Sequence, residues 1–433
     1  MPIARIESLD SQGRGVARSA EGKAVFVDGA LPGETIDYSV YRRKKNFEQA
    51  QISRIVEASG QRVTPRCAAF GRCGGCSMQH LDATAQAAVK QRVLEDALEK
   101  LGRVTPEILY PTIIGPAWRY RFRARISVRV VSKKGGVLVG FHERRSSYIA
   151  DMTACEVLPK HISDMLVPLR QLIAGLAAPA SVPQIELSIG DTETVLVFRN
   201  LEAFGPADEQ RFRDFADTHN IQVWLQPGGL DSIYLLHPLD APALSYSAPE
   251  FGIDYAFRPN DFTQVNVDIN RLLLRRAMQL LDPQPGERIG DMFCGLGNFS
   301  LPIARRGAQV IGVEGSAALV DRAAANAAAN GLAERSAFYV ANLFDATEDS
   351  FAALGHFDKL LLDPPREGAL AVVSALGADA PRRIVYVSCS PATLARDAAV
   401  LVHDKGYRLK GAGIANMFPH TSHVESIALF ERD

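Results

Sequence analysis

Two short stretches of this sequence combine residue types that do chemistry when they are brought close together. The first, DPPR at 363–366, contains Asp363, and the second, VSCSP at 387–391, contains Cys389. An apolar run precedes each stretch, so we expect each to follow a buried strand. Because neighbouring parallel strands end at the same edge of a sheet, the carboxylate and the thiol would lie side by side.

A cofactor-binding loop is predicted within 288–314. The loop, CGLGNF, follows one strand, and the next strand ends at Glu314. A dinucleotide fingerprint needs a third glycine, and this chain has Ser300 at that position. Glu314 could instead accept hydrogen bonds from both hydroxyls of a ribose, while the two glycines admit a methionine tail. With Asn342 and Asp363 at the next strand ends, the pattern favours S-adenosylmethionine.

The cysteine after the fifth strand favours methylation of carbon. Enzymes that methylate an exocyclic amine carry an aromatic residue after the two prolines, where this chain has Arg366. Uracil C5 is a poor nucleophile until a thiolate adds to C6, so Cys389 would attack C6, with a pKa lowered by its surroundings. A base must then remove the C5 proton. Glu425, at the start of the last predicted strand, is the first candidate, and Asp363 is the second.

Four further cysteines predict a metal centre. Cys67, Cys73 and Cys76 lie close together around two glycines, and Cys155 lies far downstream. Three nearby thiolates and a distant fourth suit a cubane iron–sulfur cluster. His80 leaves a mixed cysteine and histidine zinc site open, and unligated core cysteines are the third possibility.

The composition is that of a folded chain without a strong overall charge. The 433 residues are 47% hydrophobic and 22% charged, with a net charge of -1, so we expect a globular protein of two or three domains. No apolar run reaches the roughly 20 residues of a membrane helix. The first ten residues also lack the apolar centre of a signal peptide. We therefore expect a cytoplasmic protein.

Basic residues are unevenly distributed along the chain. Nine lie within 110–145 against one acid, and seven lie within 38–66 against two. Within the first cluster, Trp118, Tyr120 and Phe122 alternate with arginines, which predicts a strand with an aromatic face and a basic face. Such clusters can neutralise the phosphates of a nucleic acid. Solvated surface and ordinary strand packing are the alternative interpretations.

The order of the predicted elements divides the chain into three regions. Five short strands separated by glycine turns within 1–60 are typical of a small closed barrel. Residues 61–260 mix strands and helices in an α+β pattern, and their helix over 82–101 carries an apolar stripe that ends at Leu101. From 261 to 433, strands alternate with helices, which predicts a doubly wound parallel sheet. We expect three domains with these bounds, and the helix over 82–101 could pack on the third.

These motifs resemble those of the RNA (uracil-5)-methyltransferases, and the resemblance covers essentially the whole chain. The motifs that carry it are CGGC, DxFCGxGNFxLPxA, LDPPR, VSCxPxTLxRD and HVESxxLFER. The run VFVDGALPGE at 25–34 resembles a TRAM domain, an OB-like RNA-binding barrel. The whole arrangement is most similar to the type that modifies 23S ribosomal RNA, which combines this barrel with an iron–sulfur cluster. One departure is Gly290, where a bulkier strand residue is expected.

The resemblance implies a TRAM barrel, a central α+β domain with an iron–sulfur site and a Rossmann-like methyltransferase domain. It implies a [4Fe-4S] cluster bound by Cys67, Cys73, Cys76 and Cys155. It places S-adenosylmethionine in contact with Gln264, Phe293, Asn298, Glu314, Asn342 and Asp363. Cys389 would be the nucleophile and Glu425 the base in forming 5-methyluridine through a covalent adduct at C6. The substrate would be one uridine of 23S ribosomal RNA, and we expect a monomer without an obligate protein partner.

Three other functions compete with this interpretation. Transfer RNA is the substrate of shorter members of the family, which lack the barrel and the cluster. An iron–sulfur oxidoreductase using a nicotinamide would explain the cluster and the sheet but not Ser300. A non-catalytic RNA-binding protein would explain the basic clusters but leave the cofactor loop idle.

Carbon methylation needs no electron transfer, so we expect a structural role for the cluster. Phe262 could stack on a displaced base or pack in the core.

Overall fold

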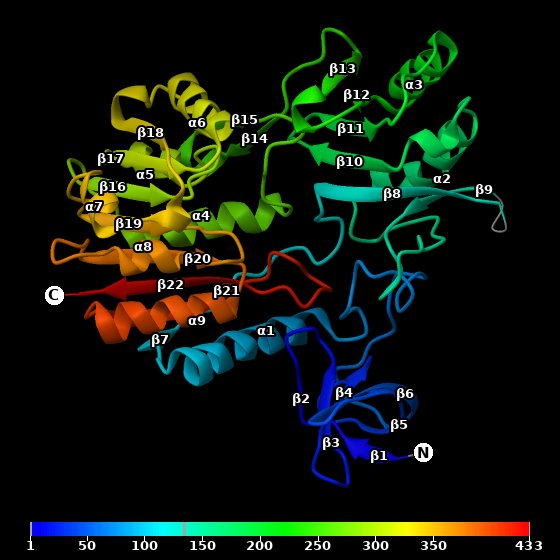
Figure 1. The fold of residues 1–433 in the computed structure, drawn as a ribbon, viewed down its shortest axis with the longest axis horizontal. Coiled ribbons are helices and arrows are strands. Elements are labelled where there is room, and N and C mark those ends of the chain that lie inside the picture. Colours follow the sequence, from blue (N-terminus) through cyan, green and yellow to red (C-terminus); the bar gives the residue numbers. More distant parts are fainter. Residues whose placement is uncertain (1, 133–135, 433) are drawn as a thin grey trace.

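The computed structural model describes residues 2–132 and 136–432. Figure 1 shows a small barrel at the bottom, a central region at the upper right and a large sheet with helices at the left. Lys133 and Lys134, which belong to the predicted basic cluster within 110–145, lie outside the described residues.

The N-terminal region is a curved six-stranded sheet with the order β1-β5-β6-β4-β3-β2. Its strands are β1 (Ile3–Arg5), β2 (Ser8–Leu9), β3 (Gly15–Arg18), β4 (Ala24–Asp28), β5 (Thr35–Arg43) and β6 (Phe47–Glu57). Alternate residues such as Val25, Val27 and Ile36 point into one small core, as the two-residue period of a strand requires. The two edge strands β1 and β2 follow each other in the chain, so this region has six strands where five were expected.

The central region is a second six-stranded sheet, with the order β13-β12-β11-β10-β8-β9. Its strands are β8 (Arg123–Val131), β9 (Gly136–Gly140), β10 (Gln184–Ile189), β11 (Thr194–Arg199), β12 (Gln222–Gln226) and β13 (Tyr234–His237). Helices α2 (Lys160–Ala174) and α3 (Pro206–His219) share its core, because Leu166 and Phe212 pack with Ile126 and Leu187 of the sheet. The α+β pattern expected here is observed.

The expected strand across Trp118–Phe122 is wrong. Strand β8 begins only at Arg123, and Arg119 has the left-handed φ of 61°, which interrupts an extended backbone. The N–H groups of Arg119 and Arg121 donate to the carbonyls of Glu156 and Val157 instead of to a neighbouring strand. The alternation of aromatic and basic side chains therefore belongs to an irregular segment that lies along 155–158.

The third region is built on an eight-stranded sheet with the order β18-β17-β16-β19-β20-β22-β21-β7. Its strands are β7 (Ile108–Leu109), β16 (Arg288–Met292), β17 (Gln309–Glu314), β18 (Ser336–Val340), β19 (Lys359–Leu362), β20 (Arg383–Ser388), β21 (Arg408–Ala415) and β22 (Glu425–Glu431). The strands from β18 to β20 are parallel, as predicted, but β22 is antiparallel to both β20 and β21. The sheet is therefore mixed, and the expectation of a wholly parallel sheet is wrong.

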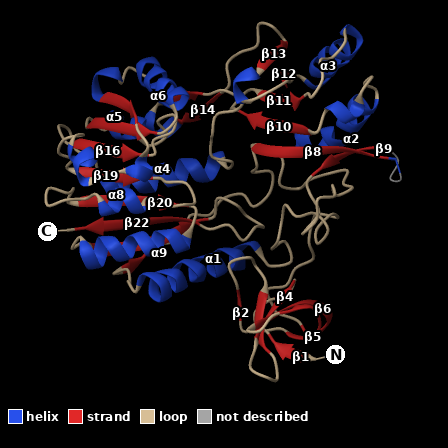
Figure 2. Ribbon diagram, viewed as in Figure 1, coloured by secondary structure: helices blue, strands red, loops and turns tan. Residues whose placement is uncertain are grey.

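Helices cover both faces of this sheet (Figure 2). One face packs on α4 (Val267–Leu281), α5 (Ser300–Arg305) and α6 (Ala317–Ala329), and the other on α1 (Ala83–Ala97), α8 (Leu370–Ser374) and α9 (Pro391–Ala399). Along β20, Val385 faces the first layer while Ile384 and Tyr386 face the second. Strands buried on both faces read as continuous apolar runs, which explains why these strands were predictable.

Helix α1 lies against α9 and β21, so a helix that precedes the central sheet in sequence covers the sheet of the third region. Asp82 caps the helix by accepting a hydrogen bond from the N–H of Thr84 at 2.9 Å. The predicted apolar stripe is wrong at its end, because Leu101 is 62% exposed. The helix instead buries the polar side chains of Gln86 and Lys90. The three domain bounds stay a prediction.

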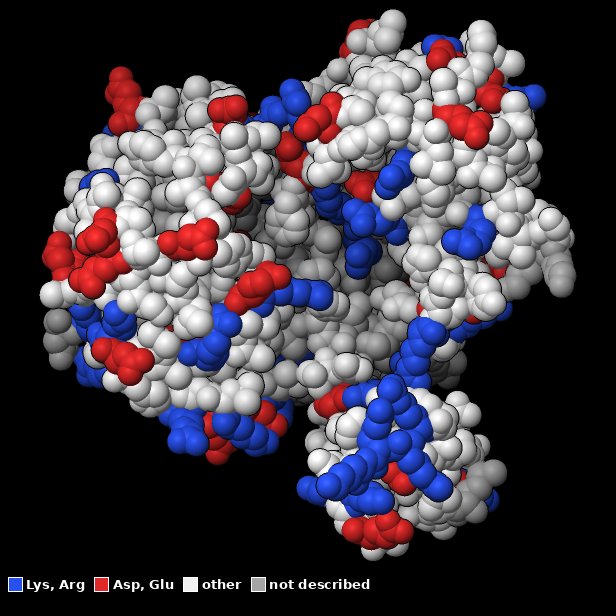
Figure 3. Space-filling view, in the orientation of Figure 1, with Lys and Arg blue, Asp and Glu red and all other residues white. Residues whose placement is uncertain are grey.

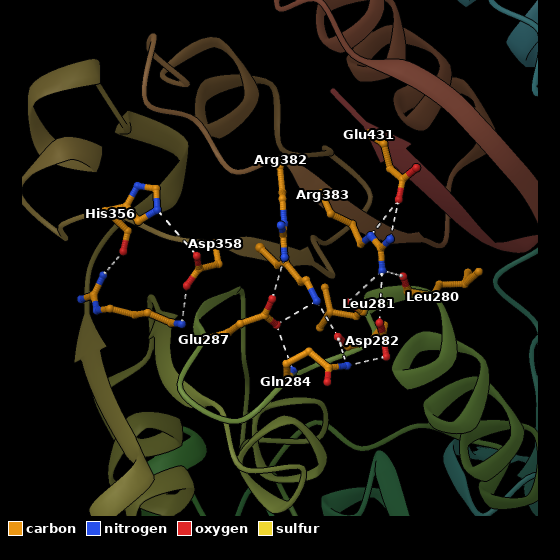
Figure 4. Close-up of polar contacts among 12 residues, drawn as sticks. Leu280, Leu281, Asp282, Gln284, Glu287, His356, Asp358, Arg382, Arg383 and Glu431 are labelled. Carbon is orange, nitrogen blue, oxygen red and sulfur yellow. Dashed lines mark hydrogen bonds and ion pairs between the residues drawn. The ribbon is translucent and has the colours of Figure 1, made fainter. Parts of the chain in front are cut away.

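A polar network joins the amino ends of the parallel strands (Figure 4). Glu287 accepts from Lys359 at 2.8 Å and from Arg382 at 2.9 Å, and Arg383 pairs with Glu431 at 2.7 Å. Lys359 is buried, so its ion pair with Glu287 fixes the start of β19. Lys359 and Arg383 open their strands, and Glu431 ends the antiparallel β22, so the network lies at the sheet edge opposite Cys389 and has a structural role.

Candidate active site

A cavity of about 540 Å³ opens at the carboxyl ends of the parallel strands, the edge at which ligands bind in sheets of this kind. The volume lies within the range of small-molecule sites. All eight residues predicted for cofactor binding and catalysis line it, namely Gln264, Phe293, Asn298, Glu314, Asn342, Asp363, Cys389 and Glu425. The structure therefore brings these side chains together, while the role of each stays a prediction.

Glu314 is fixed where β17 ends. Its carboxylate accepts the N–H of Gly295 at 3.2 Å and the N–H of Ser316 at 3.0 Å. The loop before it turns through Phe293, Gly295 and Gly297, whose φ values of 65°, 57° and 94° are left-handed. Glycine adopts such values without the steric cost that a side chain brings. A pre-oriented carboxylate beside a tight glycine turn suits two ribose hydroxyls.

The two predicted asparagines are held mainly by the protein itself. The Oδ1 atom of Asn298 accepts from the Tyr246 hydroxyl and from the Asn270 amide, both at 3.0 Å. Asn342 accepts from the N–H of Phe344 at 3.1 Å and donates to Asp345 at 2.5 Å. Each side chain therefore has limited capacity left for a ligand, and shaping the cavity is part of what it does.

Strand pairing brings Cys389 and Glu425 together. Strands β20 and β22 are antiparallel with Ser388 opposite Ser426, so the next residue of one strand end faces the preceding residue of the other. The Ser426 hydroxyl donates to the carbonyl of Ser388 at 3.0 Å and locks this register. Asp363 follows β19, the parallel neighbour of β20. The sequence prediction of a carboxylate beside a thiol therefore holds for both acids.

The electrostatics of this cluster differ from the expectation. Burial raises the pKa of Cys389 to about 11, the Glu425 and Asp363 carboxyls raise it further, and Arg366 opposes them. The prediction of a lowered thiol pKa is thus wrong for the protein without its substrates. Burial raises the pKa of Asp363 to about 8, and burial followed by Asp363 raises the pKa of Glu425 well above its usual range. Desolvation and like charge both favour the protonated acids.

Several residues of the cavity were missed by sequence reasoning. Tyr246, Phe418 and His423 line it, and Arg366 donates to His423 Nδ1 at 3.0 Å. Tyr246 lies on β14 (Ser245–Ala248), outside every motif that the sequence analysis singled out. His423 lies within the HVES motif, which was the available signal. Phe262 is 65% exposed at the cavity, so the alternative of core packing is wrong.

The four predicted cluster cysteines converge on a second cavity of about 380 Å³. All four are free of disulfides. Burial raises the pKa of Cys76 to about 12, and Cys155, Cys73 and Cys67 contribute to the increase in that pKa because they lie nearby. Within 2–132 and 136–432, no group of three or more histidine, cysteine or acidic side chains forms a site for one metal ion.

The four cysteines line this cavity, and the histidine of the alternative zinc site does not. His80 does not line the cavity and instead packs on Phe70, with ring centroids 5.4 Å apart. Arg366, Phe418 and His423 line both cavities, so the cysteine site borders the active site.

Basic side chains gather on two surfaces visible in Figure 3. One group covers the barrel, and another lines the hollow between the central region and the third region. Residues 42–45 at the end of β5 and the following turn, all arginine or lysine, are exposed. No described helix combines the length and the apolar character needed to cross a membrane.

Comparisons with known proteins define the class. A family model described as tRNA (Uracil-5-)-methyltransferase matches residues 248–433, and a TRAM domain model matches residues 4–52. The crystal structure of Pyrococcus abyssi tRNA (uracil-54, C5)-methyltransferase in complex with S-adenosyl-L-homocysteine is similar over 99% of both chains, with a TM-score of 0.74 and 25% identity. The fold is thus a TRAM domain joined to an S-adenosylmethionine-dependent methyltransferase.

Full-length relatives narrow the class. One from Aromatoleum aromaticum is 66% identical and one from Azoarcus sp. is 67% identical, each over 100% of both chains. Both are described as 23S rRNA (uracil(1939)-C(5))-methyltransferase RlmD. The chain therefore belongs to the RNA (uracil-C5)-methyltransferase family, which confirms the resemblance that its motifs carry.

Proposed function

We propose that this protein methylates C5 of one uridine in 23S ribosomal RNA. The observation that carries the proposal is the single cavity in which a thiol, two carboxyls and the predicted cofactor residues meet. The full-length relatives, whose printed names specify uracil 1939 of 23S rRNA, support the same target here. We propose that the protein acts in the cytoplasm, where its ribosomal RNA substrate would lie. We also propose that it is a monomer and acts without an obligate protein partner.

In the proposed reaction, the Cys389 thiol gives its proton to solvent and its sulfur bonds to C6 of the uracil as the C5–C6 π bond opens, which makes C5 nucleophilic. Bound S-adenosylmethionine would supply the methyl group, which bonds to C5 as its bond to the sulfonium sulfur breaks. Glu425, after giving its own proton to solvent, then takes the C5 proton, the bond between the Cys389 sulfur and C6 breaks to release the thiolate, and the C5–C6 double bond returns. The raised pKa of Glu425 suits this step, because a more basic carboxylate is a stronger proton acceptor. Asp363 orients the base and the cofactor.

The residues proposed to hold S-adenosylmethionine surround the glycine loop. Glu314 would bind the ribose hydroxyls, and Phe293, Asn342 and Asp363 line the same cavity. Asn298 would act through the shape of the loop, because Tyr246 and Asn270 already occupy its acceptor. Gln264 lines the cavity together with Phe262 and would contact the cofactor.

We also propose that Cys67, Cys73, Cys76 and Cys155 bind a [4Fe-4S] cluster. The convergence of four free cysteines on one cavity supports it. The proposed role is structural, because the cysteine segment borders the loop that precedes Glu425. Methylation rates that differ strongly between the oxidised and reduced protein would contradict that role.

The substrate is tested by incubating the protein with labelled S-adenosylmethionine and either 23S rRNA or total tRNA, then mapping 5-methyluridine by mass spectrometry. We expect one modified uridine in 23S rRNA, and none with the Cys389→Ala variant, which should still bind S-adenosylhomocysteine. Modification of tRNA alone would favour the activity in the name of the Pyrococcus structure. Tight binding of NAD without binding of S-adenosylhomocysteine would overturn the proposal.

A further inference from the structure

The loop of residues 416–424 leads directly into Glu425 and is held from outside its own region. It connects β21 to β22, and its Phe418 lines the active-site cavity. The buried Tyr120 hydroxyl donates to the carbonyl of Pro419 at 2.8 Å. Two polar residues of α1, Gln86 and Lys90, also contact the loop, although α1 lies more than 300 positions earlier in the chain.

Gln86 joins this loop to the cysteine segment. Its side chain is fully buried, its Nε2 donates to the carbonyls of Met78 and Leu81 at 3.0 and 2.8 Å, and its Oε1 accepts the N–H of His420 at 2.7 Å. The N–H groups of Ser77 and Met78 donate to the carbonyl of His420 at 2.9 and 3.0 Å. One amide therefore fixes two loops against each other.

His420 is held in a conformation that needs support. Its φ of 65° is left-handed, which costs free energy for a residue with a side chain. Its ring stacks on Trp118, with ring centroids 3.7 Å apart. Such backbone persists only when surrounding contacts determine it, and the bonds from Gln86 and the cysteine segment supply them.

Lys90 holds the same loop one turn farther along α1. Its Nζ donates to Asn416 Oδ1 and to the carbonyl of Phe418, both at 2.8 Å. The side chain is 1% exposed, and burial lowers its pKa to about 7. Burying an ammonium group against carbonyls costs free energy that an apolar side chain would avoid. A costly contact on the loop before the base indicates that it serves the geometry of that loop.

The constraint continues along the loop toward Glu425. The N–H and the hydroxyl of Thr421 both donate to the carbonyl of Phe418, at 3.3 and 3.0 Å. The N–H of His423 donates to the Thr421 hydroxyl at 3.3 Å. Cys389 also has contacts that do not involve the 416–424 loop, because Ser388 and Ser390 on either side of it hydrogen-bond to each other.

We propose that Gln86 and Lys90, with Tyr120, are positioning residues that act through the 416–424 loop to hold Glu425 for proton removal. This inference rests on the proposed function. It assigns these residues to one step only, because the nucleophile is held by other contacts. Their loss slows the breakdown of the covalent adduct and leaves its formation intact.

Two RNA substrates separate the two steps. RNA with 5-fluorouridine at the target reports only addition and methyl transfer, because its C5 has no proton to lose, whereas uridine RNA reports the whole cycle. For Gln86→Met and Lys90→Met, we expect turnover on uridine RNA to fall on the order of tenfold to hundredfold, with adduct formation on the fluorinated RNA within about twofold of the unmutated protein. The covalent adduct with uridine RNA should accumulate.

The matched control is Gln91→Met on the same helix, since the Gln91 amide bonds to Glu95 of that helix; both rates should stay unchanged. Binding of S-adenosylhomocysteine checks that each variant is folded. If the larger changes prevent folding, Tyr120→Phe removes only the hydroxyl and should give the same split with a smaller effect. A parallel loss of both rates in folded protein, or unchanged turnover, overturns the inference. Failure of the unmutated protein to form any adduct would instead defeat the proposed function.

Discussion

Three buried groups of the substrate-free active site, Cys389, Asp363 and Glu425, favour their protonated forms. Burial raises the pKa of Cys389 to about 11 and that of Asp363 to about 8, and it raises the pKa of Glu425 well above its usual range. Two neighbouring buried carboxyls cannot both ionise without a large cost. Proton movement is therefore part of the reaction at both of its ends, when the thiol adds and when C5 loses its hydrogen.

The raised thiol pKa predicts a steep pH dependence of adduct formation. Below a pKa of about 11, the thiolate fraction of Cys389 rises about tenfold per pH unit. We expect single-turnover adduct formation with 5-fluorouridine RNA to become faster with each step in pH from about pH 7 to about pH 9, the range in which enzymes usually work. A rate that is flat over this range would show that bound RNA itself lowers the pKa of the thiol.

Asp363→Asn should stabilise the fold at alkaline pH while reducing activity. A carboxyl whose pKa is raised from 3.8 to about 8 binds its proton more tightly when folded, so the stability it contributes below pH 3.8 is lost progressively as the pH rises to about 8. The neutral amide avoids this loss. We expect Asp363→Asn to melt at a higher temperature than the unmutated protein at about pH 9, which lies above the raised pKa. At about pH 4, where the carboxyl is protonated in the folded protein, the two melting temperatures should differ little.

A higher melting temperature at both pH values would trace the effect to packing rather than to ionisation. Asn342→Ala is the matched control, because this cavity residue carries no ionisable group. Its effect on the melting temperature should not change with pH.

At the scale of elements, strands buried on both faces position the site, and these were the strands that the sequence revealed. Apolar runs before 363 and 389 marked β19 and β20 correctly. Nothing local distinguishes a parallel strand from an antiparallel one, so the reversal of β22 was missed. Residues Trp118–Phe122 alternated like a strand, but the carbonyls of 156 and 157 provided their hydrogen-bond partners.

Gly290 illustrates a packing demand that a single sequence hides. A bulkier residue was expected in this strand, but a Cβ at 290 would lie 2.7 Å from Leu360 Cδ1 and 2.8 Å from Met292 Cε. We predict that Gly290→Ala destabilises the fold by about 1 kcal/mol, the low end of the range for overpacking, because only the ends of the Leu360 and Met292 side chains must move. Denaturant unfolding should show it. Gly60→Ala is the control, because its Cβ would meet nothing within 4 Å, and an equal loss there would contradict the packing argument.

At the scale of the whole molecule, the three regions contribute unequally to what could be predicted. The barrel and the methyltransferase sheet carry local patterns and motifs, so their fold and most cavity residues followed from the sequence. The hydrogen bonds of Gln86 and Lys90 to a loop more than 300 residues later could not be predicted. A polar residue on a helix gives no sign in the sequence of its distant partner. Amphipathic patterning also assigned Leu101 to the apolar stripe of that helix, although its side chain is exposed.

The exposed basic turn of the barrel predicts electrostatic binding of RNA. Lys44 and Lys45 are both exposed, so replacing both by alanine should weaken binding to 23S rRNA and reduce the slope of log affinity against log salt by up to about 1.4. Binding of S-adenosylhomocysteine should not change. Lys160→Ala with Arg213→Ala removes the same charge from residues paired with Asp164 and Glu209 on their own helices. If Lys160→Ala with Arg213→Ala weakened RNA binding equally, the attraction would come from the charge of the whole protein and not from the basic turn.

The position of β22 has a consequence for the order of folding. This strand lies between β20 and β21 in the sheet, although it is the last described strand to be synthesised. Its partner β21 also pairs with β7, which is made about 300 residues earlier. Strands β20 and β21 are joined in the sheet only through β22, so the sheet stays incomplete until Glu425 and its neighbours have left the ribosome. Insertion of the strand that carries the base completes the core, so a chain that has not finished folding cannot complete a turnover.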